Sequence, residues 1–136
     1  MIVDFIEGAV FSDERGSLFY NNSFDASTIK RIYFIESNVT SYIRGWQGHQ
    51  IEQRWFSVVK GEFKIQLIRI DNWESPSKTL KVESFSLSDK KFDVLHIPKG
   101  FVTSIQSLVQ DSKLMVLSDY LLDEVKDEFR YPIDYF

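Results

Sequence analysis

The sequence contains no cysteine, which excludes disulfide bonds, thiolate nucleophiles and metal sites built on thiolates. The lack of cysteine also fits a reducing compartment. Histidine is nearly as scarce, with only His49 and His96 among 136 residues. Because histidine is the side chain that titrates unaided near neutral pH, any proton-transfer chemistry of that type has only these two positions to use.

Long apolar segments are absent as well. No uncharged apolar run approaches the roughly 18 to 20 residues that a transmembrane helix needs. The first seven residues, MIVDFIE, have neither the basic n-region nor the apolar h-region of a signal peptide. The formal net charge is -4 and no basic stripe is present, so a nucleic acid is not an expected partner. We therefore expect a cytoplasmic protein that binds neither membranes nor nucleic acids.

The remaining composition is that of one folded domain. Hydrophobic residues make up 43% of the chain and aromatic residues 15%, which is enough for a packed core. Charged residues make up 26% and keep the surface soluble. A chain of 136 residues fits one domain and leaves no room for a second, so we expect residues 1–136 to form a single unit.

Short alternating segments dominate the chain and predict β-strands. In residues 30–35, Ile32 and Phe34 fall on one face of an extended strand, whereas Arg31 and Tyr33 fall on the other. About ten such runs follow one another at intervals of roughly 8 to 12 residues, with turn residues between them. This spacing is typical of an all-β sandwich or barrel.

Helical signals are confined to the end of the chain. No window before residue 120 sustains a period of 3.6 residues with capping residues at its ends. Asp123–Phe129 alone fits either a helical turn or an irregular segment. The pattern therefore predicts an all-β fold, but it does not distinguish a jelly roll from a barrel. Both can hold a ligand between the sheets or in the mouth of the barrel.

One polar stretch interrupts the β-type pattern and holds His49. The residues RGWQGHQIEQR, 44–54, place this histidine between the guanidinium of Arg44 and several side-chain amides, and an apolar strand follows directly. This arrangement predicts a polar pocket in a β-rich fold, in which a histidine with a pKa near neutrality is suited to act as a general base. The alternative is a hydrogen-bonded structural histidine in a strand.

Five motifs give the chain a resemblance to a known group. They are DERGSL at 13–18, KRIYFI at 30–35, RGWQGH at 44–49, IPKG at 97–100 and DYLLDE at 119–124. In order and spacing they resemble the RmlC-like sugar-nucleotide cupins, most closely the dTDP-4-keto-6-deoxyglucose 3,4-ketoisomerases (WxcM-like), with the dTDP-4-dehydrorhamnose 3,5-epimerases as cousins. The resemblance implies a cupin jelly roll, the RmlC-like double-stranded β-helix.

The chain departs from these families at three positions. The ketoisomerases have two histidines in their H-x-H motif, whereas this chain has Gln47 and His49, and the epimerases carry their base at the position of Gln47. Arg54 stands at the cupin glutamate position and Thr103 where a late histidine is expected. A cupin metal site needs three or four converging histidine or carboxylate ligands, and a guanidinium there repels a cation. We therefore expect no metal and no cofactor.

The resemblance and the chemistry together predict a catalytic set of His49, Tyr33 and Arg44. His49 is the expected general base, which removes a proton beside a ketone. Tyr33 is expected to donate or shuttle a proton, and its alternative role is that of a core tyrosine. Arg44 is expected to stabilise an enediolate or hold a phosphate, and its alternative role is an ion pair at a strand end.

A second set is predicted to bind the substrate. The Gln47 amide is suited to a sugar hydroxyl or carbonyl, and the guanidinium groups of Arg31, Arg54 and Arg69 are suited to a diphosphate. For each arginine the alternative is a surface residue. His96 is expected to be structural or to lie at a subunit contact.

We therefore predict a homodimeric protein that acts on a dTDP-4-keto-6-deoxysugar, by 3,4-ketoisomerisation through an enediolate or by epimerisation of a related sugar. The homodimer is expected to exchange strands or extend a sheet near its N-terminus, because exposed strand edges need cover. The alternative function is a non-catalytic module that binds a sugar or a nucleotide sugar and has lost the first catalytic histidine.

Overall fold

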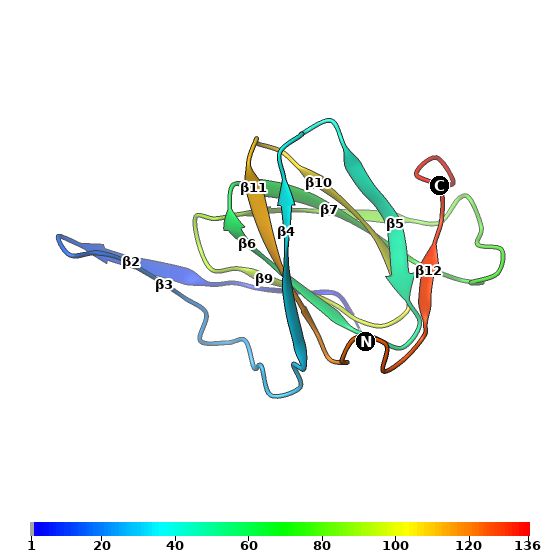
Figure 1. Ribbon diagram of the computed structural model, residues 1–136, viewed down its shortest axis with the longest axis horizontal. Helices are drawn as coiled ribbons and strands as arrows, with labels where there is room; N and C mark the ends of the chain where they lie inside the picture. Colours follow the sequence, from blue (N-terminus) through cyan, green and yellow to red (C-terminus); the bar gives the residue numbers. More distant parts are fainter. Residues whose placement is uncertain (1) are drawn as a thin grey trace.

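Two five-stranded antiparallel sheets face each other in the computed structural model, which describes residues 2–136 (Figure 1). In spatial order, the first sheet consists of β1 (Asp4–Ile6), β9 (Val94–Ile97), β6 (Arg54–Lys60), β11 (Ser112–Ser118) and β4 (Arg31–Ser37). The second sheet consists of β12 (Glu128–Arg130), β5 (Ile43–His49), β10 (Phe101–Ser107), β7 (Glu62–Arg69) and β8 (Val82–Ser88).

Alternation along the strands builds the core between the two sheets. In β7, Phe63, Ile65 and Leu67 are fully buried, while Arg69, next on the same face, is exposed at the strand end. These side chains pack against residues of β6, β9, β10 and β11 in one continuous cluster. The period of two residues therefore places an apolar face inward, which is the arrangement that the sequence predicts for an all-β sandwich.

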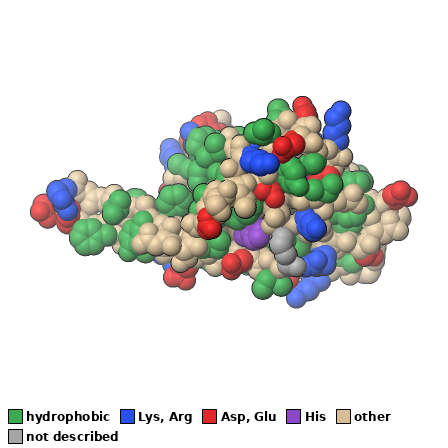
Figure 2. Space-filling view, turned by 90° about the horizontal axis from the view of Figure 1, so that it is seen from below, with side chains coloured by type: hydrophobic (Ala, Val, Ile, Leu, Met, Phe, Trp, Pro, Cys, Tyr) green, Lys and Arg blue, Asp and Glu red, His purple; other side chains and the backbone are tan. Residues whose placement is uncertain are grey.

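A two-stranded hairpin projects away from the two sheets (Figure 1). It consists of β2 (Ala9–Asp13) and β3 (Gly16–Tyr20), which pair only with each other. Figure 2 shows hydrophobic side chains along this hairpin. The exposed ones lie on both of its faces, as cross-strand pairs that join Val10 to Phe19 and Phe11 to Leu18.

The segment before β12 differs from the helical turn considered for Asp123–Phe129. Residues 119–127 form bends and turns, with Asp123 at a positive φ of 63°. Glu128 then pairs with His49 of β5, and Arg130 pairs with Gln47. The three-residue β12 is too short to give a periodic signal of its own, and its pairing with β5 determines its conformation. No helix long and apolar enough to cross a membrane is found among the described residues.

A close approach between β5 and β10 requires the glycine next to His49. A Cβ atom at Gly48 would overlap the backbone carbonyl of Phe101 and the side chain of Val102. Glycine therefore lets β5 lie against β10 at this point. The neighbours of Gly48, Gln47 and His49, direct their side chains to the opposite face of β5, toward the interior of the sandwich.

Candidate functional site

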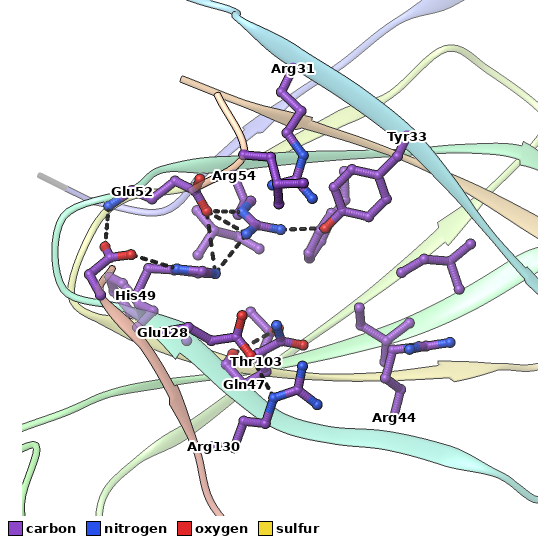
Figure 3. Close-up of a pocket in the computed structure, with 18 of the residues that line it drawn as sticks. Arg31, Tyr33, Arg44, Gln47, His49, Glu52, Arg54, Thr103, Glu128 and Arg130 are labelled. Carbon is purple, nitrogen blue, oxygen red and sulfur yellow. Dashed lines mark hydrogen bonds and ion pairs between the residues drawn. The ribbon is translucent and has the colours of Figure 1, made fainter. Parts of the chain in front are cut away.

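A cavity of about 680 Å³ opens between the two sheets (Figure 3). Its walls come from β4 and β6 of the first sheet, from β5, β10 and β12 of the second, and from the turns of residues 122–127. A volume of this size suits a small-molecule ligand. Six of the seven predicted site residues line this cavity: Arg31, Tyr33, Arg44, Gln47, His49 and Arg54.

Arg69 is the predicted residue that does not line this cavity. It borders a separate hollow of about 430 Å³ near the N-terminal residues Ile2 and Val3. Its guanidinium lies over the ring of Phe101, 4.7 Å from the centroid. Arg69 and His49 pair with Phe101 of β10 from its two sides, and Phe101 lines both hollows. Phe101 therefore lies between Arg69 and the cavity that holds His49.

His49 is buried in the wall of the cavity and contacts a carboxylate that the sequence motifs did not indicate. Its Nδ1 lies 3.0 Å from Oδ1 of Asp127, and both side chains are at least nine-tenths buried. Asp127 lies in the turn before β12, and the pairing of Glu128 with His49 brings it to this position. The carboxylate therefore orients the imidazole ring from behind.

Asp127 is held as a carboxylate by its surroundings. Burial alone raises its pKa, but hydrogen bonds from the backbone N–H groups of Glu52 and Ile51 and from His49 outweigh that effect, and the pKa of Asp127 lies below its usual value. The two backbone donors lie 2.8 and 2.7 Å from Oδ2. Asp127 therefore fixes the turn after β5 and the orientation of His49 at once.

Arg54 links His49 to Tyr33. Its Nη2 lies 2.7 Å from Nε2 of His49, and its Nη1 donates to the hydroxyl of Tyr33. The guanidinium also forms a buried ion pair with Glu52, in which Nε lies 2.7 Å from Oε2. The four side chains thus form one hydrogen-bonded group on one wall of the cavity (Figure 3). Glu52 was not among the predicted site residues.

Arg44 lies apart from this group, toward the other end of the cavity (Figure 3). It forms no ion pair with any residue that the structure describes, so the alternative of a structural ion pair has no partner among residues 2–136. Arg31 lies nearer the Arg54 group, with its guanidinium 4.6 Å from the ring centroid of Tyr33. Arg130 of β12 also lines the cavity and pairs with Glu128 at 2.5 Å.

The four positions that correspond to cupin metal ligands do come together in the cavity. The cavity is lined by all four, Gln47, His49, Arg54 and Thr103. The Thr103 hydroxyl donates to the backbone carbonyl of Gln47 at 3.4 Å. Among residues 2–136, no three His, Asp or Glu side chains are grouped so that they can hold a metal ion.

His96 belongs to a different environment, outside the cavity. Its ring stacks on Trp55 with centroids 4.7 Å apart, and its Nε2 donates to the amide oxygen of Gln53 at 2.7 Å. Gln53 in turn donates to Asp119 at 3.1 Å. Burial lowers the pKa of His96, and the negative charges of Asp4 and Asp119 offset part of this shift. These contacts describe a histidine that is part of the packing.

The missed site residues carried little sequence signal. Asp127, Glu52 and Glu128 are three of the twenty acidic residues of the chain, and they follow no catalytic motif of their own. An aspartate that lies 78 residues from its histidine partner is recognised only once the pairing of β12 with β5 is known.

A family model described as "FdtA: WxcM-like, C-terminal" matches residues 1–135. The chain belongs to the WxcM-like, C-terminal family. No curated protein sequence matches it.

Solved structures of three enzymes resemble this WxcM-like chain. A histidine-to-asparagine variant of the 3,4-ketoisomerase QdtA from Thermoanaerobacterium thermosaccharolyticum, in complex with TDP-4-keto-6-deoxyglucose, is 22% identical with a TM-score of 0.73, over 98% of this chain and 90% of that one. The WlaRB TDP-quinovose 3,4-ketoisomerase from Campylobacter jejuni is 20% identical with a TM-score of 0.72, over 98% and 95%. The dTDP-4-dehydrorhamnose 3,5-epimerase from Bacillus anthracis is 17% identical with a TM-score of 0.76, over 97% and 79%.

At these identities the likeness establishes the fold. The WxcM-like chain is an all-β RmlC-like cupin, a jelly roll of two antiparallel sheets, and the prediction of that fold is confirmed. The function of a cupin resides in its cavity rather than in its sheets, so activity has to be argued from the side chains around His49.

Proposed function

We propose that this protein isomerises a dTDP-4-keto-6-deoxysugar by moving the ketone from C4 to C3 through an enediolate. The observation that carries the proposal is the hydrogen-bonded pair of His49 and Asp127 in the wall of the cavity. A buried imidazole oriented by a carboxylate is suited to abstract a proton from carbon and return it. Membership of the WxcM-like family and the likeness of the fold to that of 3,4-ketoisomerases support the same reaction.

The proposed reaction needs one base and a group that accepts negative charge. His49 takes the proton from C3, the C–H electron pair forms the C3–C4 double bond, and O4 takes the negative charge. The proton then returns to C4, and the hydroxyl proton on O3 passes to O4, which leaves the ketone at C3. We assign the transfer of the proton between the two oxygens to Tyr33, which Arg54 joins to His49 through hydrogen bonds.

The charge distribution of the cavity supports a diphosphate at the end that holds Arg44. Arg44 has no ion-pair partner among the described residues, and Arg31 is engaged only with the ring of Tyr33. Guanidinium groups without carboxylate partners bind phosphate oxygens well. We assign the sugar to the His49 end of the cavity and the diphosphate to Arg44 and Arg31. Gln47, between them on β5, is assigned to a sugar hydroxyl.

A second candidate function is a module that binds a nucleotide sugar without converting it. The observation in its favour is that Gln47 stands where the ketoisomerase motif has its first histidine, because an amide cannot titrate. This alternative uses the same cavity and the same ligand class. It differs from the enzyme only in whether protons exchange at the carbons beside the ketone.

We also propose that the protein acts as a homodimer. The hairpin of β2 and β3 exposes apolar pairs on both faces, and a two-stranded hairpin is marginal by itself in water. The edge strand β4 carries exposed Ile32 and Phe34. Strand exchange or sheet extension between two copies would cover both of these surfaces.

The decisive experiment incubates the protein with dTDP-4-keto-6-deoxyglucose in deuterated water and follows the sugar by NMR. We expect a 3-keto product with deuterium at C4, the carbon of the original ketone, because the proton that His49 takes from C3 exchanges with solvent before it returns to C4. His49→Asn should bind the nucleotide sugar nearly as well but react slower by a factor on the order of 10² to 10⁴. His96→Asn is the matched control, since the other histidine lies outside the cavity. Binding without any solvent exchange in the wild type would establish the second candidate instead.

A further inference from the structure

The nitrogen of His49 that would accept the substrate proton is already occupied by Arg54. The guanidinium has only N–H donors, so at 2.7 Å from Nη2 the Nε2 atom of His49 must be the acceptor. Nε2 therefore carries the lone pair, and the ring proton is on Nδ1. That proton is donated to Oδ1 of Asp127 at 3.0 Å, so the two hydrogen bonds specify the same tautomer.

This bond is incompatible with the proposed proton transfer while it persists. Once Nε2 has taken a proton it becomes a donor toward Oε2 of Glu52, 3.4 Å away, and it can no longer accept the N–H group of Arg54. The hydrogen bond between Arg54 and His49 must therefore break in every catalytic cycle. In the free protein the guanidinium caps the base.

The guanidinium can release His49 without leaving the wall of the cavity. Its Nε and Nη2 atoms both bond to Oε2 of Glu52, and its Nη1 donates to Tyr33. Glu52 is buried, with 6% of its surface exposed, and it anchors the group. A small rotation about this anchor would turn the N–H of Nη2 that faces His49 away from Nε2 while the ion pair with Glu52 remains.

We propose that Arg54 is a substrate-responsive cap on His49 and a further catalytic residue. When a ketone occupies the His49 end of the cavity, the Nη2 group of Arg54 donates its hydrogen bond to the ketone oxygen instead of to Nε2 of His49. This one exchange of acceptors frees the lone pair of His49 and polarises the carbonyl. The negative charge on the enediolate oxygen then forms beside a guanidinium. The inference rests on the proposed isomerase function.

This role differs from the diphosphate contact that the sequence predicts for Arg54. The Arg54 side chain is 12% exposed and already shared among three partners, whereas Arg44 is exposed and has no ion-pair partner among residues 2–136. A diphosphate would have to separate Arg54 from a buried carboxylate, which is unfavourable. A neutral ketone oxygen requires no such separation, because the ion pair with Glu52 remains.

The cap is tested on the free protein with diethyl pyrocarbonate, which acylates an unprotonated imidazole nitrogen. Peptide mass spectrometry of untagged protein reports the rates at His49 and His96 separately. Removal of the hydrogen bond in Arg54→Met should accelerate acylation of His49 about tenfold, the effect of one well-formed hydrogen bond. The rate at His96 should not change, because His96 bonds to Gln53. Equal rates at His49 in wild type and variant would overturn the cap.

A second variant separates the loss of the hydrogen bond from a loss of folding. Arg54→Met leaves the carboxylate of Glu52 buried without its partner, which is costly. In the double variant Glu52→Gln with Arg54→Met both charges are absent, and we expect the same acceleration at His49. Nitrogen-15 NMR of the wild type should show a proton on Nδ1 of His49. A proton on Nε2 would overturn the proposal by itself.

The response to a ketone is tested with three ligands: dTDP, dTDP-glucose, which carries a hydroxyl at C4, and dTDP-4-keto-6-deoxyglucose. Only the ketone should shift the Nε2 resonance of His49 as Arg54 releases it. Arg54→Met should leave the dissociation constant of dTDP within about twofold of the wild type, while the isomerisation rate falls by on the order of 10² to 10³, the effect of losing one oxyanion donor.

The outcomes separate this proposal from the proposed function. If the wild type isomerises the sugar but all three ligands shift the Nε2 resonance of His49 equally, the isomerase function stands and the ketone-triggered release is overturned. Weaker dTDP binding by Arg54→Met would overturn the assignment in favour of a diphosphate contact. If the wild type binds the ketone, shifts Nε2 and shows no solvent exchange, the cap and its release stand and the isomerase function fails.

Discussion

Nδ1 of His49 lies 3.0 Å from a carboxylate oxygen of Asp127, a residue 78 positions further along the chain. The carboxylate accepts hydrogen bonds from the ring N–H and from the backbone N–H groups of Ile51 and Glu52. Asp127 borders the cavity, but its carboxylate bonds to the imidazole and to the backbone, so we treat it as a positioning residue. Its effect on the reaction passes through the tautomer and orientation of His49.

Replacement of Asp127 by asparagine should therefore change the tautomer before it changes the fold. The new amide can donate to Nδ1, which moves the ring proton to Nε2 and removes the lone pair that acts as base. We expect the isomerisation rate to fall by about 10² or more, with nitrogen-15 NMR showing a proton on Nε2. The amide oxygen can still accept from Ile51 and Glu52, but it is neutral, and the loss of the charged acceptor should lower the free energy of unfolding by about 1 to 3 kcal/mol.

Asp119→Asn is the matched control for that experiment. Asp119 likewise accepts a backbone N–H, from Gln53 at 2.8 Å, but it does not line the cavity. This variant should lose stability to a similar extent and keep the rate per folded molecule. Equal losses of rate in both variants would mean that Asp127 acts only through the fold.

Restoring the missing histidine should raise the rate of isomerisation. Gln47 and His49 lie on the same face of β5 and both line the cavity, so Gln47→His places a second titratable group beside the base. We expect a gain of about tenfold in the NMR assay. Gln50→His adds the same side chain just outside the cavity and should have no effect. A binding-only module would show no solvent exchange in either variant.

Dimer formation should depend on the apolar side chains of the hairpin. Phe11 and Phe19 are 56% and 47% exposed and lie on opposite faces of it. We expect the wild type to sediment as a dimer at micromolar concentration and the double variant Phe11→Ser, Phe19→Ser as a monomer. Val39→Ser with Val59→Ser removes similarly exposed apolar side chains from the body of the protein and should leave the dimer intact. A monomeric wild type would refute the homodimer.

Mild acid should destabilise the protein through His96. Burial holds the pKa of His96 below its usual value in the folded protein, so this ring stays neutral while the unfolded chain takes up a proton. Stability is therefore fully present above the unfolded pKa, near 6.5, and falls as the pH drops below it. Urea unfolding at pH 7 and pH 5 should show a smaller loss for His96→Gln than for the wild type. Equal losses would contradict a lowered pKa.

The sequence predicted the fold because its alternating strands and motifs are local signals. Phe63, Ile65 and Leu67 show the alternation directly, and the two faces of β4 were predicted from residues 30–35. The convergence of Tyr33 and His49 on one cavity was predicted through the family resemblance. Arg69 borders a different hollow because β10 lies between β7 and β5, and the order of the strands in the sheet cannot be read from alternation alone.

The contacts within the site could not be predicted in the same way. Glu52 and Arg54 are two residues apart, but their pairing depends on the turn after β5 that Asp127 holds. The position of Asp127, which holds that turn, depends on β12, a strand too short to recognise from its sequence. Such contacts are set by tertiary structure, and no local pattern encodes them.

The strand that delivers Asp127 is also one of the least supported in the molecule. β12 has three residues, lies at the edge of its sheet and pairs with β5 alone. Its local opening would break few backbone hydrogen bonds and would leave the core between the sheets intact. The carboxylate and the imidazole can thus separate in a subglobal fluctuation, so the lifetime of the assembled site is governed by the fraying of one short edge strand. The global unfolding of the sandwich sets only the upper limit of that lifetime.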